Sequence, residues 1–72
     1  MKTYTISAQE RGGAVAIPIK REKGTSDNAM RGAWIVSTHA HLCDIVLTQG
    51  SKHVVTYRNG VITHLNGKEH KA

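Results

Sequence analysis

The feature that most constrains the fold is an Asn59-Gly60 dipeptide between two runs rich in β-branched residues, 52–58 and 61–65. Asparagine and glycine both tolerate positive φ, which a two-residue type I′ turn requires at its two central positions. The pattern therefore predicts a β-hairpin. An unbroken register would pair Arg58 with Val61 and continue to Val54 opposite Leu65.

This register assigns the hairpin residues to two faces, because successive side chains of a strand point to opposite sides. One face would carry Val54, Val61 and Leu65, with Arg58 at its margin, and is the expected core side. The other face would carry Val55, Tyr57, Ile62 and His64. That second face is expected to stay partly exposed and to be available to a partner.

Further strand patterns precede the hairpin. Residues 2–7 alternate, with Tyr4 and Ile6 on one side. Residues 14–19 form a second candidate and contain Pro18, which cannot donate to a ladder and so favours an edge strand. Residues 33–38 and 43–48 complete the set.

Two helical alternatives remain in the middle of the chain. Ser26 or Asp27 could cap a short helical turn over residues 26–31. A longer helix from about residue 33 to 47 stays open as an alternative to strands, although its β-branched residues argue weakly against it.

These patterns predict an all-β fold, a small antiparallel sheet or partly open barrel of five to six strands. Its C-terminal half is a three-stranded meander over residues 43–48, 52–58 and 61–65. Residues 1–66 form one domain, and residues 67–72 form a polar frayed tail.

The core of this domain is thin. The chain has 72 residues with six Ile, six Val and three Leu, and Tyr4 and Trp34 are expected to be buried. The single Cys43 cannot form an intramolecular disulfide. Because an edge strand also needs covering, the sequence predicts a homodimer.

Charge and segment lengths restrict location and partners. The formal net charge is +5, which favours acidic surfaces or nucleic acid as partners. No apolar run approaches the ~20 residues that cross a bilayer. No secretory signal pattern is present and the cysteine is free, so the expected location is the cytoplasm.

The basic residues are the predicted contact site. Lys20, Arg21 and Lys23 lie in a segment, 20–32, that is expected to be a long mobile loop. Arg31 follows in the same segment. Together with Arg58 and Tyr57 these residues are predicted to bind a macromolecular partner through charge-assisted hydrogen bonds.

A zinc site is the weaker alternative. His39, His41 and Cys43 alternate and would share one face of an extended strand, and His64 could complete the set. No Cys-x-x-Cys pair supports it, so the prediction is no metal and no cofactor. No complete catalytic constellation is present either, and the chain is predicted not to be an enzyme.

The resulting hypothesis is a small regulatory or inhibitor-type protein, of the kind that phages and mobile elements encode. It would bind a protein or nucleoprotein through the basic loop and a sheet edge. The alternative is a nucleic-acid-binding module that contacts the phosphate backbone.

Overall fold

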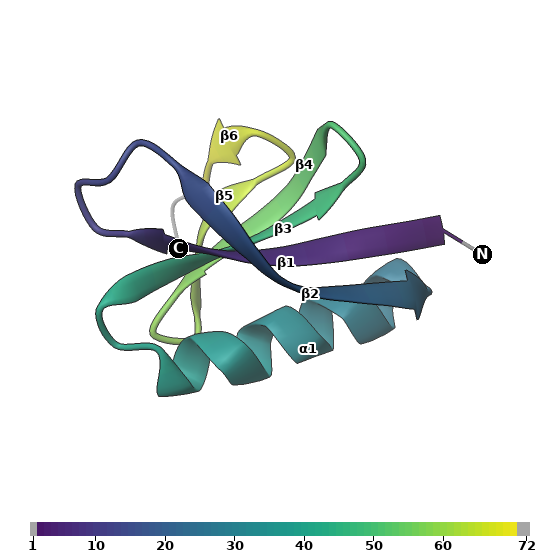
Figure 1. The fold of residues 1–72 in the computed structure, drawn as a ribbon, viewed down its shortest axis with the longest axis horizontal. Coiled ribbons are helices and arrows are strands. Elements are labelled where there is room, and N and C mark those ends of the chain that lie inside the picture. The colour runs from purple at the N-terminus through teal and green to yellow at the C-terminus, as the bar shows by residue number, and fades with distance from the viewer. Residues whose placement is uncertain (1, 71–72) are drawn as a thin grey trace.

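The computed structural model describes residues 2–70, which form one six-stranded sheet and one helix (Figure 1). The elements in chain order are β1 (Lys2–Glu10), β2 (Ala16–Gly24), α1 (Ser26–His39), β3 (Cys43–Gln49), β4 (Lys52–Arg58), β5 (Val61–Leu65) and β6 (Lys68–Glu69). All neighbouring strands are antiparallel, in the order β2-β1-β3-β4-β5-β6. The predicted small antiparallel sheet with a C-terminal meander, β3-β4-β5, is confirmed.

Helix α1 covers one face of the sheet, and the core lies between them. The sheet contributes its largest buried side chains in pairs from β1, β3 and β4: Tyr4 and Ile6, Ile45 and Leu47, Val55 and Tyr57. The helix contributes only small ones, Ala29, Ala33 and Ser37. Small residues at this spacing of four let the helix backbone approach the sheet closely. The opposite sheet face carries no helix within residues 2–70, and we call it the open face.

The helix corrects the strand predicted over residues 33–38. The expected turn at residues 26–31 is confirmed but continues to His39. Thr25 caps the helix, since its hydroxyl accepts a hydrogen bond from the Asn28 amide at 3.3 Å. Ile35 and Val36 suggested a strand, yet their propensity penalty in a helix is below about 1 kcal/mol each. Burial of the small-residue stripe against the sheet outweighs that penalty.

Strand β2 corrects the long loop predicted from residue 20. Residues 20–24 continue the strand and pair with β1, with Arg21 opposite Thr5 and Lys23 opposite Thr3. The edge position predicted from Pro18 is confirmed. A polar segment can form an edge strand because its outer side stays hydrated, which is why hydrophobic alternation did not reveal it.

The opening hairpin forms, but its predicted register holds only next to the turn. Arg58 pairs with Val61 and Tyr57 with Ile62 as predicted, after which the register shifts by one residue. The next partners are Thr56 with His64 and Val55 with Leu65.

The predicted faces are also reversed. Val55 and Tyr57 are buried, and Ile62 and Leu65 pack against the same core. Val61, assigned to the core from the sequence, is 57% exposed. Val55, Tyr57 and Ile62 share one face as alternation predicts, but α1 covers that face rather than the opposite one. The β-bulge adds Leu65 to this core face, because one unpaired residue moves everything beyond it to the other face.

Two smaller expectations also change. Tyr4 is buried as predicted, but Trp34 is 46% exposed on α1. Lys68–Glu69, within the predicted frayed tail, pair with β5 as strand β6, while residues 71–72 of that tail lie outside the described residues. In the described part of the chain, no helix is long and apolar enough to span a membrane.

Candidate functional site

Two surfaces of the molecule carry polar or apolar groups that could contact another molecule. The first is the outer side of β2 with the residue that precedes it, which we call the β2 edge (residues 15–23). The second is the open face of the sheet. Four of the contact residues predicted from the sequence lie on them: Lys20, Arg21 and Lys23 on the β2 edge and Arg58 on the open face.

The β2 edge is an unpaired strand margin. Strand β2 pairs with β1 on one side, and no strand among residues 2–70 pairs with its other side. Backbone N–H and C=O groups that point outward from such an edge can be completed by a strand from another chain. The edge is interrupted once, by a register shift on the β2 side of Ile6 and Ser7.

Three large aliphatic side chains are exposed along this edge. Val15 is 72%, Ile17 65% and Ile19 52% exposed. Ile19 lies between the paired residues Pro18 and Lys20 and has no partner in β1. Scattered exposed aliphatics are common on small proteins. Three within five residues nevertheless concentrate exposed apolar surface on one unpaired margin of the sheet.

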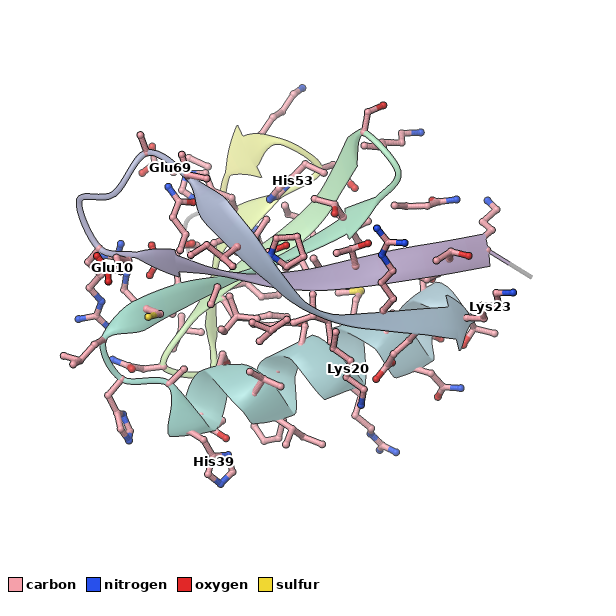
Figure 2. The ribbon with its side chains drawn as sticks, in the orientation of Figure 1. Glu10, Lys20, Lys23, His39, His53 and Glu69 are labelled. Atoms are coloured by element: carbon pink, nitrogen blue, oxygen red, sulfur yellow. The ribbon has the colours of Figure 1, made fainter. Side chains whose placement is uncertain are left out.

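The same edge continues as a cationic segment. Lys20 is paired with Glu22, its Nζ lying 2.8 Å from Oε1. Arg21 and Lys23 are exposed and make no ion pair with any described residue. Figure 2 shows Lys23 at the end of β2, with Lys20 closer to the helix. Two of the three predicted β2 cations are therefore free to contact a partner.

The other predicted contact residues lie elsewhere. Arg31 is exposed on α1, and Arg58 lies on the open face. Tyr57 is only 5% exposed within the core, so its assignment as a contact residue is wrong. The error arises because α1 covers the hairpin face that was expected to stay partly exposed. Burial also raises the pKa of the Tyr57 hydroxyl above its ordinary value.

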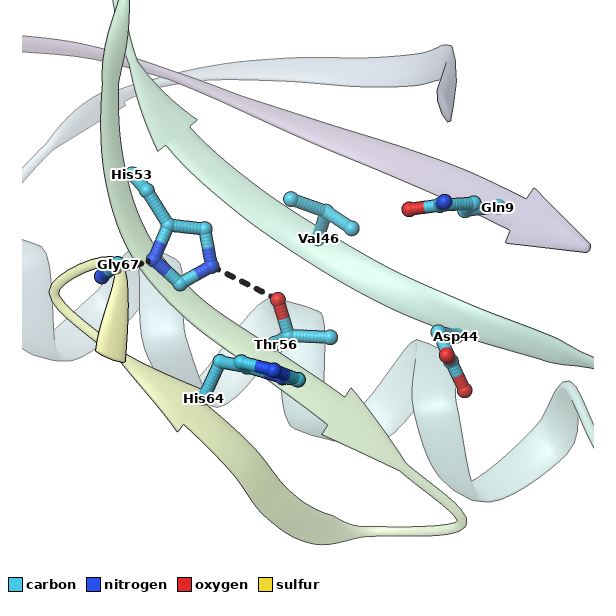
Figure 3. Close-up of a pocket in the computed structure, with 7 residues that line it drawn as sticks. All are labelled: Gln9, Asp44, Val46, His53, Thr56, His64 and Gly67. Carbon is cyan, nitrogen blue, oxygen red and sulfur yellow. Dashed lines mark hydrogen bonds between the residues drawn. The ribbon is translucent and has the colours of Figure 1, made fainter. Parts of the chain in front are cut away.

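The open face contains a shallow polar hollow of about 370 Å³ (Figure 3). Side chains from β1, β3, β4 and β5 line it: Gln9, Asp44, Val46, His53, Thr56 and His64, with the backbone of Gly67. Apart from Val46 these are hydrogen-bonding groups. The hollow therefore suits a polar or charged ligand better than an apolar one.

Two hydrogen bonds fix the orientation of His53 at one end of the hollow. The Gly67 amide donates to Nδ1 at 2.7 Å, so Nδ1 carries no proton. The proton of the neutral ring is then on Nε2, which donates to the Thr56 hydroxyl at 2.7 Å. Burial, and then the nearby charge of His64, lower the pKa of His53. Both effects maintain the neutral form that these bonds require.

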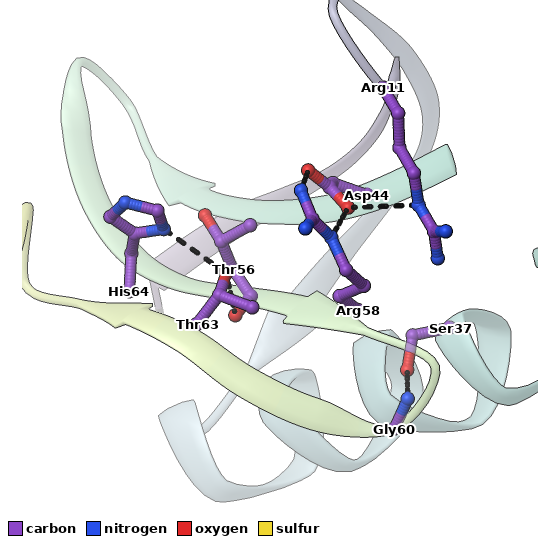
Figure 4. Close-up of polar contacts among 8 residues, drawn as sticks. All are labelled: Arg11, Ser37, Asp44, Thr56, Arg58, Gly60, Thr63 and His64. Atoms are coloured by element: carbon purple, nitrogen blue, oxygen red, sulfur yellow. Dashed lines mark hydrogen bonds and ion pairs between the residues drawn. The ribbon is translucent and has the colours of Figure 1, made fainter. Parts of the chain in front are cut away.

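At the other end an acidic residue lies between two guanidinium groups (Figure 4). Arg58 donates from Nε and Nη2 to the two carboxylate oxygens of Asp44, at 2.8 and 2.9 Å. Arg11 Nε lies 4.0 Å from Asp44 Oδ1. The hydrogen bond from Arg58 is the main reason that the pKa of Asp44 is lowered. Burial opposes this effect, and the charges of Arg58, Arg11 and His64 lower the pKa further. Two cations and one anion leave this group with a net positive charge.

The histidines and the cysteine of the zinc alternative do not come together. His39 is the last residue of α1 and points away from the sheet, while Cys43 begins β3 and His64 lies on β5 (Figure 2). The alternation argument assumed one extended strand, and the helix ending at His39 removes that assumption. No group of three or more His, Cys, Asp or Glu side chains within the described residues could hold a metal ion.

Sequence reasoning missed Asp44 and Arg11 as partners in the group with Arg58, and it missed His53 and Thr56 as residues that line the hollow. The position of Asp44 beside Arg58 could have been predicted from the sequence. The 43–48 and 52–58 strands were predicted to be adjacent and antiparallel, which places Asp44 at the same end of the sheet as Arg58. The Arg11 and His53 contacts depend on the β1–β3 pairing and on the β5–β6 turn, and no short-range pattern reports either.

No protein-family model matches this chain, and neither the curated proteins nor the solved structures contain a match. The geometry of the β2 edge and of the open face is therefore the basis for assigning a function.

Proposed function

We propose that this chain is a small non-enzymatic binding protein whose β2 edge takes up an extended, acidic and apolar segment of a partner protein. One observation carries the proposal: an unpaired strand margin exposes Ile17 and Ile19 directly beside two cations, Arg21 and Lys23, that have no ion-pair partner among the described residues.

The backbone supplies the first part of the interaction. An extended segment that lies beside β2 would become a seventh strand and form main-chain hydrogen bonds with the outward N–H and C=O groups. Such bonds depend little on sequence. The segment must be extended, and it must tolerate the interruption of the ladder near Pro18 and Ile19.

Side chains supply the specificity. Ile17 pairs with Ala8, whereas Arg21 and Lys23 pair with Thr5 and Thr3, so Ile17 and the two cations point to opposite faces of the sheet. Apolar side chains of the segment would cover Ile17 and Ile19 and remove their exposed surface from water, which contributes roughly 25 cal/mol per Å² of apolar area. Acidic side chains on the other face of the segment would meet Arg21 and Lys23. The expected ligand therefore alternates carboxylates with β-branched residues.

The homodimer expected from the sequence is the competing occupant of this edge. In a fully paired antiparallel β2–β2 dimer the two-fold axis passes near Lys20, which would place Lys20 opposite its copy, and Arg21 and Lys23 opposite Ile19 and Ile17 rather than opposite acidic groups. Like charges placed opposite each other across strands are destabilising. Pro18 also prevents a continuous ladder. These two features favour an acidic heterologous partner.

By binding an extended segment of its target, so small a protein could regulate that target. A segment that is bound as a strand on β2 is unavailable for other contacts. The effect on the target would be inhibition when that segment is needed for its activity.

Calorimetric titration with synthetic peptides tests the proposal. We expect a peptide of alternating Glu and Val to bind, and the matched Lys-Val peptide not to bind. The Arg21→Glu and Ile17→Ser variants should weaken the Glu-Val complex about tenfold or more. The Val61→Ser variant is the control, because Val61 is similarly exposed but lies on β5. Equal binding of both peptides, or no loss in the β2 variants, would contradict the proposal.

A further inference from the structure

The second surface, the open face, supports a different interaction. We infer that it binds the phosphate backbone of a nucleic-acid strand, with Arg58 and Arg11 as the principal contacts. This site lies on β3, on β4 and in the turn after β1 rather than on the β2 edge, and it does not depend on the proposed function.

Arg58 is held in a fixed orientation with donors to spare. A guanidinium group has five N–H donors in a planar fork. The two bonds to Asp44 use one hydrogen on Nε and one on Nη2, so three remain. The side chain is 49% exposed, and these hydrogens have no other acceptor within residues 2–70. A phosphate oxygen could accept from them without disturbing the bond to Asp44.

Asp44 orients the cations without cancelling their charge. Arg58 donates to both of its oxygens, and Arg11, 40% exposed, lies 4.0 Å from one of them. The group of three carries a formal charge of +1 at neutral pH. Two guanidinium groups on one carboxylate therefore present a positive surface whose geometry is set before a ligand arrives.

His64 and Thr56 extend this surface along the hollow. His64 Nδ1 lies 3.1 Å from the Thr63 hydroxyl, which itself donates to the Thr56 carbonyl at 3.3 Å. The Thr63 hydroxyl therefore accepts from His64 Nδ1–H, and Nε2 has no hydrogen-bond partner in the described part of the chain. The Thr56 hydroxyl accepts from His53, which leaves its own proton available. These are hydrogen-bonding groups of the kind that contact sugars and phosphate esters.

The placement of the aromatic residues defines the mode of binding. Tyr4 and Tyr57 are buried in the core, and Trp34 lies on α1, which covers the opposite side of the sheet. The open face thus offers no aromatic platform for stacking bases among the residues described. Binding should follow the backbone and show little dependence on base sequence.

Fluorescence anisotropy with a labelled single-stranded poly(U) oligonucleotide tests this inference. At low salt we expect saturable binding whose log–log salt slope is about −1.5 to −2, as two or three phosphate contacts to a single strand would give. A poly(dA) oligonucleotide should bind with a similar affinity. An absence of binding at low salt would overturn the inference.

Charge-matched variants locate the site. Arg58→Gln and Arg11→Gln should each weaken binding about tenfold and reduce the salt slope by roughly one contact. Arg31→Gln removes the same charge from the exposed side of α1 and should change affinity less than about twofold. If Arg31→Gln weakens binding as much as Arg58→Gln does, the interaction is general charge attraction and the inference is wrong.

Asp44→Asn separates ligand contact from a structural role of the ion pair. The substitution removes the carboxylate charge but keeps both guanidinium groups, so affinity should be retained or increased. If the Asp44–Arg58 pair only stabilised the sheet, Asp44→Asn and Arg58→Gln would lose binding together, and the inference would fail. Thermal unfolding of each variant verifies that the sheet is intact.

Discussion

The sharpest stability prediction concerns Ser37, which joins α1 to the β4–β5 turn. Its side chain is fully buried, and its hydroxyl donates to the Trp34 carbonyl at 2.7 Å. The same oxygen accepts from the Gly60 amide at 3.0 Å. The Trp34 indole in turn donates to the Gly60 carbonyl at 2.9 Å. Both backbone groups of Gly60 are thus bound by the helix (Figure 4 shows the Ser37 bond).

We expect Ser37→Ala to lower the free energy of unfolding by about 1–2 kcal/mol. Loss of an acceptor for a partly buried amide costs about 1–3 kcal/mol. The better helix propensity of alanine returns about 0.5 kcal/mol. For a domain of this size, 1 kcal/mol corresponds to about 4–8 °C, so Tm should fall by about 5–15 °C.

Circular dichroism melts measure this change, and amide hydrogen exchange identifies its origin. The Gly60 amide should lose protection in the Ser37→Ala variant, beyond the loss due to global destabilisation. Thr38→Ala is the control, because the Thr38 hydroxyl bonds only within α1, to the Ile35 carbonyl and the His39 ring. An unchanged Tm, or a Gly60 amide that exchanges as slowly as in the parent, would refute the reasoning.

Three further predictions concern pH and the turn. The pKa of Asp44 is lowered in the folded state, so Asp44 stabilises the fold at pH values above its ordinary pKa of 3.8. This stabilisation is lost as the pH falls through the lower pKa of the folded state. Asp44→Asn should remove this part of the acid denaturation curve. The pKa of His53 is also lowered, so stability should decrease as pH falls from 6.5 toward the folded value, and His53→Gln should flatten that slope in urea titrations. Gly60→Ala should destabilise by more than about 1 kcal/mol, because φ is +79° and a Cβ would lie 3.1 Å from the Thr38 methyl group; a stability equal to that of the parent would show that the turn can relax.

Much of the fold could be predicted from short-range patterns. The Asn59-Gly60 turn, the edge position of the strand with Pro18 and the burial of Tyr4 each follow from the conformational preference or alternation of nearby residues. The structure has all three. They are local properties, and local properties can be read from a sequence.

The errors have two physical sources. Residues 33–38 became a strand in the prediction because β-branched side chains favour it, but those preferences are small beside the burial of a helix on a sheet. The hairpin faces were reversed because α1 packs on the face of Val55 and Tyr57, and no pattern within the hairpin reports which face the helix covers. A bulge near Thr63 adds Leu65 to that face, and no residue type there requires a bulge.

The candidate surfaces were predictable only in part. The cations Arg21 and Lys23 were identified correctly as exposed groups, although on a strand rather than in a loop. The group around Asp44 was not identified, since it requires the β1–β3 and β3–β4 registers together. The exposure of a charged side chain could be predicted from its residue type. Which side chains come together in one site depends on the tertiary structure.

The most direct test of the central claim is amide hydrogen exchange of the protein with and without the Glu-Val peptide. The β2 amides are assigned individually by NMR. If the β2 edge docks an extended segment, the exchanging amides of residues 19–24 should become protected when the peptide is added, while those of β6 at the other sheet edge should not change. Protection on β6 or the open face, or no protection on β2 at saturating peptide, would contradict the account.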